Sequence, residues 1–572
     1  MDENLIGMLR AMLTIAGAWW LGLLAFGGIG LCFLRLAGLK IRGVEDCLSS
    51  FWVGWALALS ALQVWHLFWP VDARATLCFL AVGLLGLAYN FPLLIGPCRH
   101  ALRPLGLFLL CAFLFSVWLA NRAMSPLGQY DAGLYHLSVI RWTSSFPIVP
   151  GLGNLHGRLA FNSSYYLYMA LLDVGPWAHR LYHMAPGLLL LALGLQISFS
   201  VLRIIGQSTP PQAPDLVRVG LIPLYVWLLL LGINDTSADL AVLILCIVVY
   251  VELARLLLAS EPETRQLLGA LTTAFLAVAA VTLKLSALAF AVSAGLIAVG
   301  VLRHAQRVRS LHVPWAWLWW ATLLALAVWM GRGIVLSGYP AYPSTLGAVN
   351  VDWRVPTEAA REEARWVMSW ARAPGEQPDE VLDGWDWLRP WAGRVLGEAR
   401  FVLAIPLFLA ALLGLAAAVR FRRSGRPLMV CLLLVPPLAS LIFWFLIAPE
   451  PRFVGTAPWL VAAGMLLLAL EMWGWSRFRQ TALFLLMVSV AVTLVMYLTS
   501  EKFVDPGPLD GFYPLPTAEL EAITLSSRLT IYVPARGDQC WDAPLPCTPN
   551  PQPTLRLRVV GDLASGFTVS PP

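Results

Sequence analysis

The sequence predicts an α-helical protein that crosses a membrane many times, and composition, run length and loop charge all support this prediction. Of the 572 residues, 59% are hydrophobic and only 13% are charged, whereas an average soluble domain has roughly 25% charged residues. Uncharged runs of about 20 residues recur along the chain, and a helix needs that length to cross the hydrocarbon core of a bilayer. The net charge of +6 is mild, so the composition does not indicate a nucleic acid as partner.

Apolar windows predict about fourteen transmembrane helices along the chain. The region 267–302 is longer than one crossing requires, and Lys284 interrupts it, so we divide it there into two helices. The predicted spans lie near residues 11–34, 50–69, 75–96, 105–121, 181–202, 217–233, 237–257, 267–283, 285–302, 314–335, 398–419, 428–447, 455–474 and 480–499.

Basic residues in the short connections orient these spans, because cytoplasmic loops carry an excess of Lys and Arg. With fourteen spans, six basic connections fall on one side: 35–42, 98–103, 203–218, 303–309, 420–426 and 475–479. The acidic N-terminus, the long segments 122–180 and 336–397, and the tail fall on the other side. The sequence therefore predicts a protein of the bacterial inner membrane, with its long loops and C-terminus on the periplasmic side.

The long outer segments also carry local patterns. The spacing of Leu134, Leu137, Ile140 and Trp142 predicts a short amphipathic helix lying on the membrane surface. Helical patterns cover 357–372 and 378–396, and strand-like runs cover 528–533 and 555–560. We predict three regions: N-terminal accessory helices (1–104), a transmembrane core (105–499) and a small α/β outer domain (500–572).

Cys540 and Cys547 are the two cysteines that share a polar segment. On the outer side of the membrane a disulfide persists, and a tail of about 70 residues gains stability from one. The alternative is two free thiols. A metal site has less support, since no further Cys or His lies nearby in the sequence.

Acids and bases gather at the outer ends of the predicted spans, and the sequence shows no equivalent set at the inner ends. Each can be read singly as an interfacial side chain that extends to the headgroups. Together they suit a phosphate-bearing lipid: cations hold the phosphate, while a carboxylate activates a hydroxyl acceptor or binds a divalent ion such as Mg²⁺ or Mn²⁺. The set comprises Asp131, Asp235, Asp239, Lys284, Arg332, Glu450 and Arg452.

Histidines in and near the first outer segment offer a rival interpretation. His179 and His183 have the i, i+4 spacing of a helical metal site. At the start of a span, an interfacial role is the simpler one. We also expect seven polar and aromatic side chains to line a substrate pocket: Tyr130, Tyr135, His136, His156, Arg158, Asn162 and Glu450.

Longer stretches resemble known proteins: YDAGLYHLSVIRW (130–142), VPGLGNLHGRLAFNSSYY (149–166), SGYPAYPS (337–344) and CWDAPLPC (540–547). They are similar to a bacterial multi-pass family of uncharacterised function. The order of a span, a large acid-bearing first outer loop, many spans and an outer C-terminal domain resembles the GT-C superfamily of integral membrane glycosyltransferases, which use polyprenyl-phosphate sugar donors.

The GT-C resemblance implies roles for particular residues. Asp131 matches the outer-loop acid that serves as catalytic base or metal-associated carboxylate, and Asp235 or Asp239 matches a second acid. Lys284, Arg332 and Arg452 match the basic helix ends that bind the donor phosphate. The implied partners are a polyprenyl-phosphate sugar donor, a glycan, lipid or protein acceptor, and membrane lipids. A lipid or solute transporter or flippase, an O-antigen-ligase-like transferase with a pyrophosphate-linked donor, and a non-catalytic scaffold are the alternatives.

Overall fold

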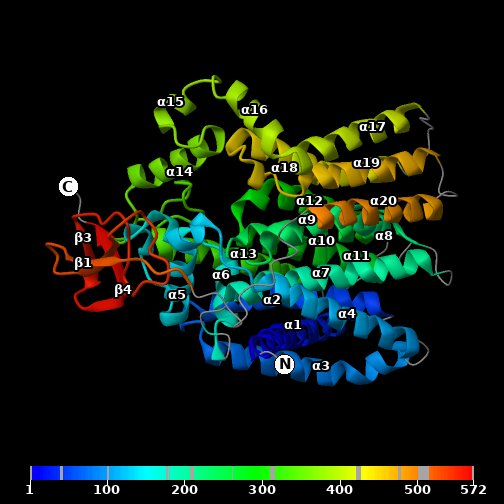
Figure 1. Cartoon of the computed structure of the whole chain (residues 1–572), viewed down its shortest axis with the longest axis horizontal. Helices are drawn as coiled ribbons and strands as arrows, with labels where there is room; N and C mark the ends of the chain where they lie inside the picture. Colours follow the sequence, from blue (N-terminus) through cyan, green and yellow to red (C-terminus); the bar gives the residue numbers. More distant parts are fainter. Residues whose placement is uncertain are drawn as a thin grey trace.

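The chain folds into a bundle of long helices with a small β region at one end (Figure 1). This computed structural model describes residues 3–38, 41, 43–98, 102–175, 178, 181–206, 211–259, 262–308, 316–419, 427–473, 478–499 and 515–569. The described part is mostly helical. Its apolar helices have the number and length of those in a multi-pass membrane protein.

Twelve helices in the described ranges are long and apolar enough to cross a membrane. The helix containing Arg400–Val419 begins with a π-helical turn, η7 (Arg400–Ala404). The twelve are α1 (Glu3–Leu36), α2 (Val44–Trp65), α3 (Ala73–Cys98), α4 (Leu102–Ala123), α7 (Leu181–Ile205), α10 (Ala238–Leu258), α11 (Glu263–Leu283), α12 (Leu288–Val308), α13 (Ala316–Ser337), α17 (Ile405–Val419), α18 (Pro427–Ile447) and α20 (Phe478–Thr499).

The predicted number of fourteen exceeds these twelve for two reasons. The window 217–233 is not one helix, because α8 (Ala213–Gly220) and α9 (Ile222–Gly232) meet at a 43° bend. The window 455–474 corresponds to α19 (Ala457–Trp473), which is apolar but shorter than the twelve. Mean hydropathy is insensitive to a helix break, and Pro223 at the start of α9 favours one there. The division of 267–302 is confirmed, because Lys284 and a 3₁₀ turn, η6 (Leu285–Ala287), separate α11 from α12.

The helix predicted after Asp131 exists, but its proposed place on the membrane surface is wrong. A π-helical turn, η2 (Ala132–His136), leads into α5 (Leu137–Ser145). All four apolar side chains of the pattern are buried in the protein. Trp142, for example, packs edge-on against Phe567 of the C-terminal region, with ring centroids 5.8 Å apart. The apolar face therefore packs against protein, which its spacing alone could not distinguish from lipid.

The rest of this segment and the segment after α13 consist of short helices. The first continues through η3 (Leu152–Asn154), η4 (Gly157–Ala160) and α6 (Ser164–Leu172). The second contains α14 (Thr357–Arg372), α15 (Pro378–Leu382) and α16 (Leu388–Glu398), close to the predicted stretches. In Figure 1, α5 and α14 lie at the same end of the bundle as the strands.

The C-terminal region contains only strands in its described part, residues 515–569, so the predicted α/β composition is wrong there. Two antiparallel pairs form, β1 (Leu520–Thr524) with β2 (Thr530–Pro534), and β3 (Leu555–Val559) with β4 (Asp562–Val569). The backbone N–H of Phe567 donates to the Pro150 carbonyl at 2.9 Å. Gly566 has φ +96°, and a Cβ there would lie 2.1 Å from that carbonyl oxygen. Glycine thus allows β4 to approach the first long loop.

Helices α10 and α11 define two ends of the bundle. Asp239 begins α10 and Lys284 ends α11, at what we call the Asp131 end. Arg255 and Arg265 lie at their opposite termini, at what we call the Glu45 end. All six predicted basic connections include residues outside the described ranges, and 420–426 lies wholly outside them.

Candidate functional site

Asp131 directly precedes η2 in the loop that follows α4, and its carboxylate accepts hydrogen bonds from two guanidinium groups. Arg158 of η4 donates to one carboxylate oxygen at 3.3 Å, and Arg452 donates to the other at 3.1 Å. Arg452 lies in a 3₁₀ turn, η8 (Pro451–Phe453), between α18 and α19. Folding thus brings together an acid and a base that are 321 residues apart in the sequence.

A second ion pair lies beside the first. Lys284, at the end of α11, donates to Asp239 in the first turn of α10. The Phe453 ring contacts both pairs: the Lys284 Nζ lies 4.3 Å from its centroid, and the Arg452 guanidinium carbon lies 4.9 Å from it. Cations over an aromatic face are attracted to it. Phe453 therefore links Lys284 to Arg452.

Glu363 of α14 completes the set by accepting from Arg158 Nε at 3.3 Å. Burial raises the pKa of Glu363, and Arg158 opposes this shift. Partial burial lowers the pKa of Arg452, but the carboxylates of Asp131 and Asp239 outweigh that effect and the pKa is raised. We call this set the Asp131 cluster, and it consists of Asp131, Arg158, Asp239, Lys284, Glu363, Arg452 and Phe453.

The cations of the Asp131 cluster are more exposed than its acids. The Arg452 side chain is 52% exposed, and those of Arg158 and Lys284 are 32% and 31% exposed. The Asp131 and Asp239 carboxylates are 17% and 18% exposed. Although the charges balance in number, the accessible surface of the cluster is therefore positive and suits an anionic ligand.

Asp235 lies in the turn between α9 and α10 and is buried. Burial raises its pKa to about 7, and a hydrogen bond with the Ser237 backbone N–H opposes the shift. Its side chain also hydrogen-bonds to Gln129, two residues before Asp131. Asp235 thus titrates near neutral pH, as a general acid or base should, but it lies deeper than the exposed cations.

Aromatic rings border the cluster on the side of η2. Arg158 lies over the Tyr135 ring, 5.9 Å from its centroid, and Tyr135 packs edge-on against Phe161 at 5.8 Å. His136 hydrogen-bonds through Nδ1 to the Thr236 hydroxyl at 2.9 Å. Burial lowers the pKa of His136 to about 3, so its ring is neutral at physiological pH.

Several predicted residues have other surroundings. Glu450 accepts from Arg394 of α16 at 2.8 Å, a contact that holds the α16 segment to the turn after α18. Tyr130 is exposed and donates to Asp538 of the C-terminal region. Burial lowers the pKa of His156 to about 4.

Three further predictions concern Asn162, Arg332 and the histidine pair. Asn162 and Arg332 contact each other, with Arg332 Nε 3.4 Å from the Asn162 side-chain oxygen. His183 lies within hydrogen-bonding reach of the Ala123 carbonyl. His179, its proposed partner in a metal site, lies outside the described residues.

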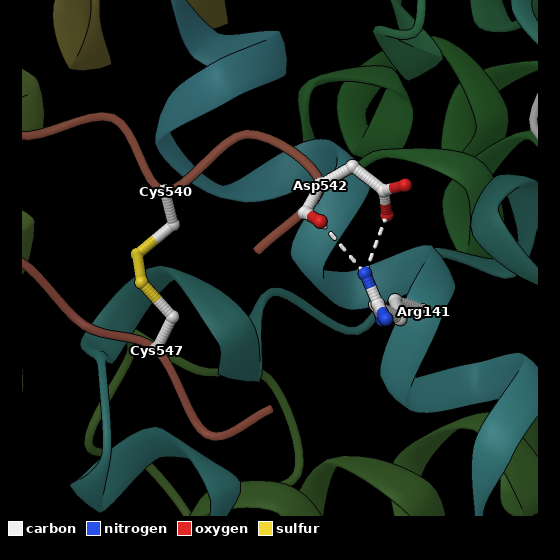
Figure 2. Close-up of a disulfide and its surroundings, with 4 residues drawn as sticks. All are labelled: Arg141, Cys540, Asp542 and Cys547. Atoms are coloured by element: carbon white, nitrogen blue, oxygen red, sulfur yellow. Dashed lines mark hydrogen bonds and ion pairs between the residues drawn. A yellow bond between two sulfur atoms is a disulfide. The ribbon is translucent and has the colours of Figure 1, made fainter. Parts of the chain in front are cut away.

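A disulfide-closed loop rests on the turn that follows Asp131. The predicted bond between Cys540 and Cys547 is confirmed. Arg141 of α5 binds Asp542, a residue of this loop. It donates to the Asp542 backbone carbonyl at 2.7 Å and to the Asp542 carboxylate at 2.9 Å (Figure 2). The backbone N–H of Trp541 donates to the Gly133 carbonyl at 2.9 Å. The C-terminal region thus supports the backbone that carries Asp131.

The predicted divalent cation does not fit the groups present around Asp131. Both carboxylate oxygens of Asp131 accept hydrogen bonds from guanidinium groups, and the Asp239 carboxylate is paired with the Lys284 ammonium. Mg²⁺ and Mn²⁺ prefer clustered oxygen ligands. Throughout the described ranges, no three His, Cys, Asp or Glu side chains are grouped in a way that could hold a metal ion.

The expectation that the inner helix ends lack a comparable set is wrong. At the Glu45 end, the Glu45 carboxylate binds Arg203, Arg218 and Arg255, with Arg218 at 2.9 Å. Asp46 pairs with Arg265 at 2.7 Å. A cavity of about 80 Å³ adjoins them. We call this set the Glu45 cluster, and its members are Glu45, Asp46, Arg203, Asp215, Arg218, Glu252, Arg255 and Arg265.

Two members of the Asp131 cluster were absent from the predicted set. Glu363 lies in the run REEAR of α14, where three neighbouring charges look like an ordinary solvated helix face. Phe453 follows Arg452 directly, and a basic–aromatic pair at a helix end was a usable signal. Glu363 had no such signal, because only its contact with η4 distinguishes it from its neighbours.

Comparison with known proteins identifies a family. A family described as a domain of unknown function (DUF8201) matches residues 12–457, which is most of the chain, and the protein belongs to that family. The match includes the helical bundle up to the start of α19 and therefore the whole Asp131 cluster. No curated protein and no solved structure matches the chain.

Proposed function

We propose that the protein is a membrane glycosyltransferase that transfers a sugar from a polyprenyl-phosphate-linked donor to a cell-envelope acceptor. The reaction would take place at the Asp131 cluster, on the outer face of the bacterial inner membrane. The observation that carries this proposal is the contact between Asp131 and Arg452 beside Lys284, with the cations exposed and the acids more buried.

Arg452 and Lys284 are the proposed donor-phosphate ligands. Both lie at the ends of membrane-crossing helices or in the turn between them, where the phosphate of a membrane-anchored lipid would lie. A guanidinium can bind phosphate through two parallel hydrogen bonds, and an ammonium adds a compact charge. Phe453 holds both cations at one place.

Donor binding would also prepare the acid. In the structure each Asp131 oxygen accepts from one guanidinium group, and the two arginines compete with an acceptor hydroxyl for the carboxylate. Arg452 is the more exposed of its two partners, so we propose that Arg452 leaves Asp131 for the donor phosphate. Arg158, held by Glu363, would keep the Asp131 carboxylate in place.

The transfer step then follows from the released oxygen. The acceptor hydroxyl oxygen bonds to the anomeric carbon of the sugar, and the bond from that carbon to the phosphate oxygen breaks. The departing polyprenyl phosphate keeps the electron pair, and Arg452 and Lys284 stabilise its added negative charge. Asp131 takes the hydroxyl proton as general base. Tyr135 and Phe161 would provide apolar walls for the sugar ring.

A transfer assay with purified protein tests this proposal. Wild type and Asp131→Asn are incubated with radiolabelled polyprenyl-phosphate sugars, with pyrophosphate-linked donors and with membrane extract. We expect transfer from a monophosphate donor by the wild type and a loss of at least about 100-fold in the variant. Arg365→Gln removes an exposed arginine that pairs with Asp379, and should behave as wild type. Transfer that survives Asp131→Asn unchanged would overturn the catalytic assignment.

A transporter or flippase is the second candidate, and the Glu45 cluster favours it. Charged clusters lie at both ends of α10 and α11, as they would in a protein whose two ends open alternately. Liposomes that contain the purified protein and a fluorescent polyprenyl phosphate distinguish the two functions, because movement of the lipid between leaflets can be measured in them. Movement of the lipid between leaflets without sugar transfer would support the transporter and contradict the transferase.

A further inference from the structure

Arg332 is a buried cation whose hydrogen-bond partners within the described ranges are neutral. It lies in α13 and is 4% exposed. Its Nη1 donates to His66 Nδ1 at 2.8 Å, and its Nε donates to the Asn162 side-chain oxygen at 3.4 Å. His66 Nε2 lies 3.1 Å from the Phe146 carbonyl. His66 therefore carries its proton on Nε2, accepts from Arg332 through Nδ1, and is uncharged.

No carboxylate in the described ranges pairs with Arg332. This separates it from Lys284 and Arg452, which both have acids beside them. A buried charge without a counter-charge is strongly destabilising. The C-terminal ends of α2 and α13 lie nearby, but a helix terminus supplies only about half of a negative charge, and much of that is screened. The guanidinium therefore lacks a full negative partner.

A small cavity adjoins the guanidinium. It has a volume of about 20 Å³, and its lining includes Arg332, His66, Asn162 and Trp142 but no Asp or Glu. That volume suffices for about one water-sized particle. A phosphate or a carboxylate-bearing lipid is too large for it. The remaining lining is largely apolar, with Val139 and Leu336 among its members.

Trp142 provides an independent indication at the same cavity. It is 2% exposed, and its indole Nε1 has no hydrogen-bond partner in the described part of the chain. Buried N–H groups almost always have a partner, and an orphaned one indicates an unseen water or ion. Trp142 has only a donor to offer. Thus the cavity is lined by Arg332, whose charge no carboxylate in the described ranges balances, and by Trp142, whose N–H is unused within those ranges, and an anion would satisfy both.

We propose that this cavity binds a single monatomic anion, chloride under physiological conditions, between the Arg332 guanidinium and the Trp142 indole N–H. The anion neutralises Arg332 and joins α13 to α5 of the first long loop. This assignment replaces the expected donor-phosphate role of Arg332, and it stands whether or not the protein transfers sugars.

The test measures the thermal unfolding midpoint of the full-length protein in detergent. Chloride is exchanged for gluconate at constant ionic strength, because gluconate is too large for the cavity. The midpoint should rise with chloride to a plateau, since a ligand that binds only the folded state stabilises it. Bromide should act in the same way and give an anomalous X-ray signal next to Arg332. A wild-type midpoint that does not depend on halide would overturn the proposal.

Variants locate the effect. Arg332→Gln should abolish the halide dependence. Trp142→Phe removes the N–H donor together with part of the indole ring and should weaken the apparent halide affinity about tenfold. Trp55→Phe is the matched control, because Trp55 is another buried indole that lacks a hydrogen-bond partner among the described residues, and it does not line this cavity. If Arg332→Gln does not fold, the comparison of Trp142→Phe with Trp55→Phe decides. Equal halide responses in those two variants would contradict the site.

Discussion

The Asp131 cluster and the Glu45 cluster lie at opposite termini of the same two helices, yet they differ in which charges water can reach. In the Asp131 cluster, Arg452 is the most exposed member of its ion pairs, at 52%. In the Glu45 cluster, Arg218 has a side chain that is only 1% exposed, while its acid, Glu45, is 19% exposed. One cluster exposes its cations to solvent, and the other encloses them.

The secondary-structure elements that carry the residues explain this difference in exposure. The arginines around Glu45 come from α7, α8 and α10, and Glu45 itself begins α2. One carboxylate thus connects four helices of the bundle. The Asp131 cluster instead draws Arg158, Glu363 and Arg452 from η4, α14 and η8, which lie outside the long helices. Segments of that kind can move without disturbing helix packing. We therefore propose that a ligand binds at the Asp131 end and that the Glu45 cluster stabilises the packing of the helices.

The largest expected effect comes from Glu45→Gln, which tests the structural role. The substitution leaves Arg203, Arg218 and Arg255 without the carboxylate they share. Removing one partner of a buried pair costs about 3 to 5 kcal/mol. Thermal unfolding in detergent should therefore show a clear loss of stability. Glu362→Gln, at an exposed position of α14, is the control. Equal unfolding midpoints in the two variants would refute the structural role.

A smaller effect is expected from Gly133→Ala, which tests the support of the Asp131 turn. A Cβ at Gly133 would lie 2.6 Å from the Trp541 ring. Overpacking of this kind costs about 1 to 3 kcal/mol, and the disulfide-closed loop should be displaced. Limited proteolysis would report faster cleavage of the C-terminal region, and sugar transfer should fall with it.

Gly128→Ala is the matched control for that experiment, because a Cβ at Gly128 meets nothing within 4 Å. Identical cleavage rates for the two alanine variants would show that the C-terminal loop does not support the Asp131 turn.

Arg452 distinguishes charge from hydrogen-bond geometry at the Asp131 end. Arg452→Gln should raise the KM for the lipid donor about tenfold, the loss of about one charge-assisted hydrogen bond. Arg452→Lys keeps the charge but loses the planar fork, so its KM should lie between that of the Gln variant and that of wild type. Both variants should unfold within about 1 kcal/mol of wild type, since exposed ion pairs contribute little. A large loss of stability would instead place Arg452 with the structural arginines.

The stability of the protein should also depend on pH through Asp235. Burial raises its pKa from 3.8 to about 7. Between these values the unfolded chain loses the proton while the folded protein keeps it, so folded stability falls as pH rises through this window. Asp235→Asn removes that contribution. The unfolding midpoint of the variant relative to wild type should therefore rise from pH 4 to pH 7 and level off above. A difference that stays constant with pH would show that Asp235 is ionised throughout.

The sequence predicted local secondary structure well, but it predicted poorly which parts of the chain pack against each other. The disulfide, the break at Lys284 and the helix α14 follow from residues that are close in the chain. The pattern around Trp142 correctly predicted a helix, but its apolar face packs against protein. Periodicity indicates which face of a helix is apolar but does not identify what covers it.

The sequence by itself determined that this protein consists of many apolar helices with long polar excursions, because run length and composition are properties of consecutive residues. It also placed Asp131 in the first long segment beyond a predicted span, and Lys284 and Arg452 in turns between predicted spans. Only the tertiary structure decided that Lys284 and Arg452 share Phe453 and that Arg452 pairs with Asp131, while no carboxylate in the described ranges pairs with Arg332. Asp131 and Arg452 are 321 residues apart, and His66 and Arg332 are 266 residues apart, so their contacts and their burial arise only when the helices pack.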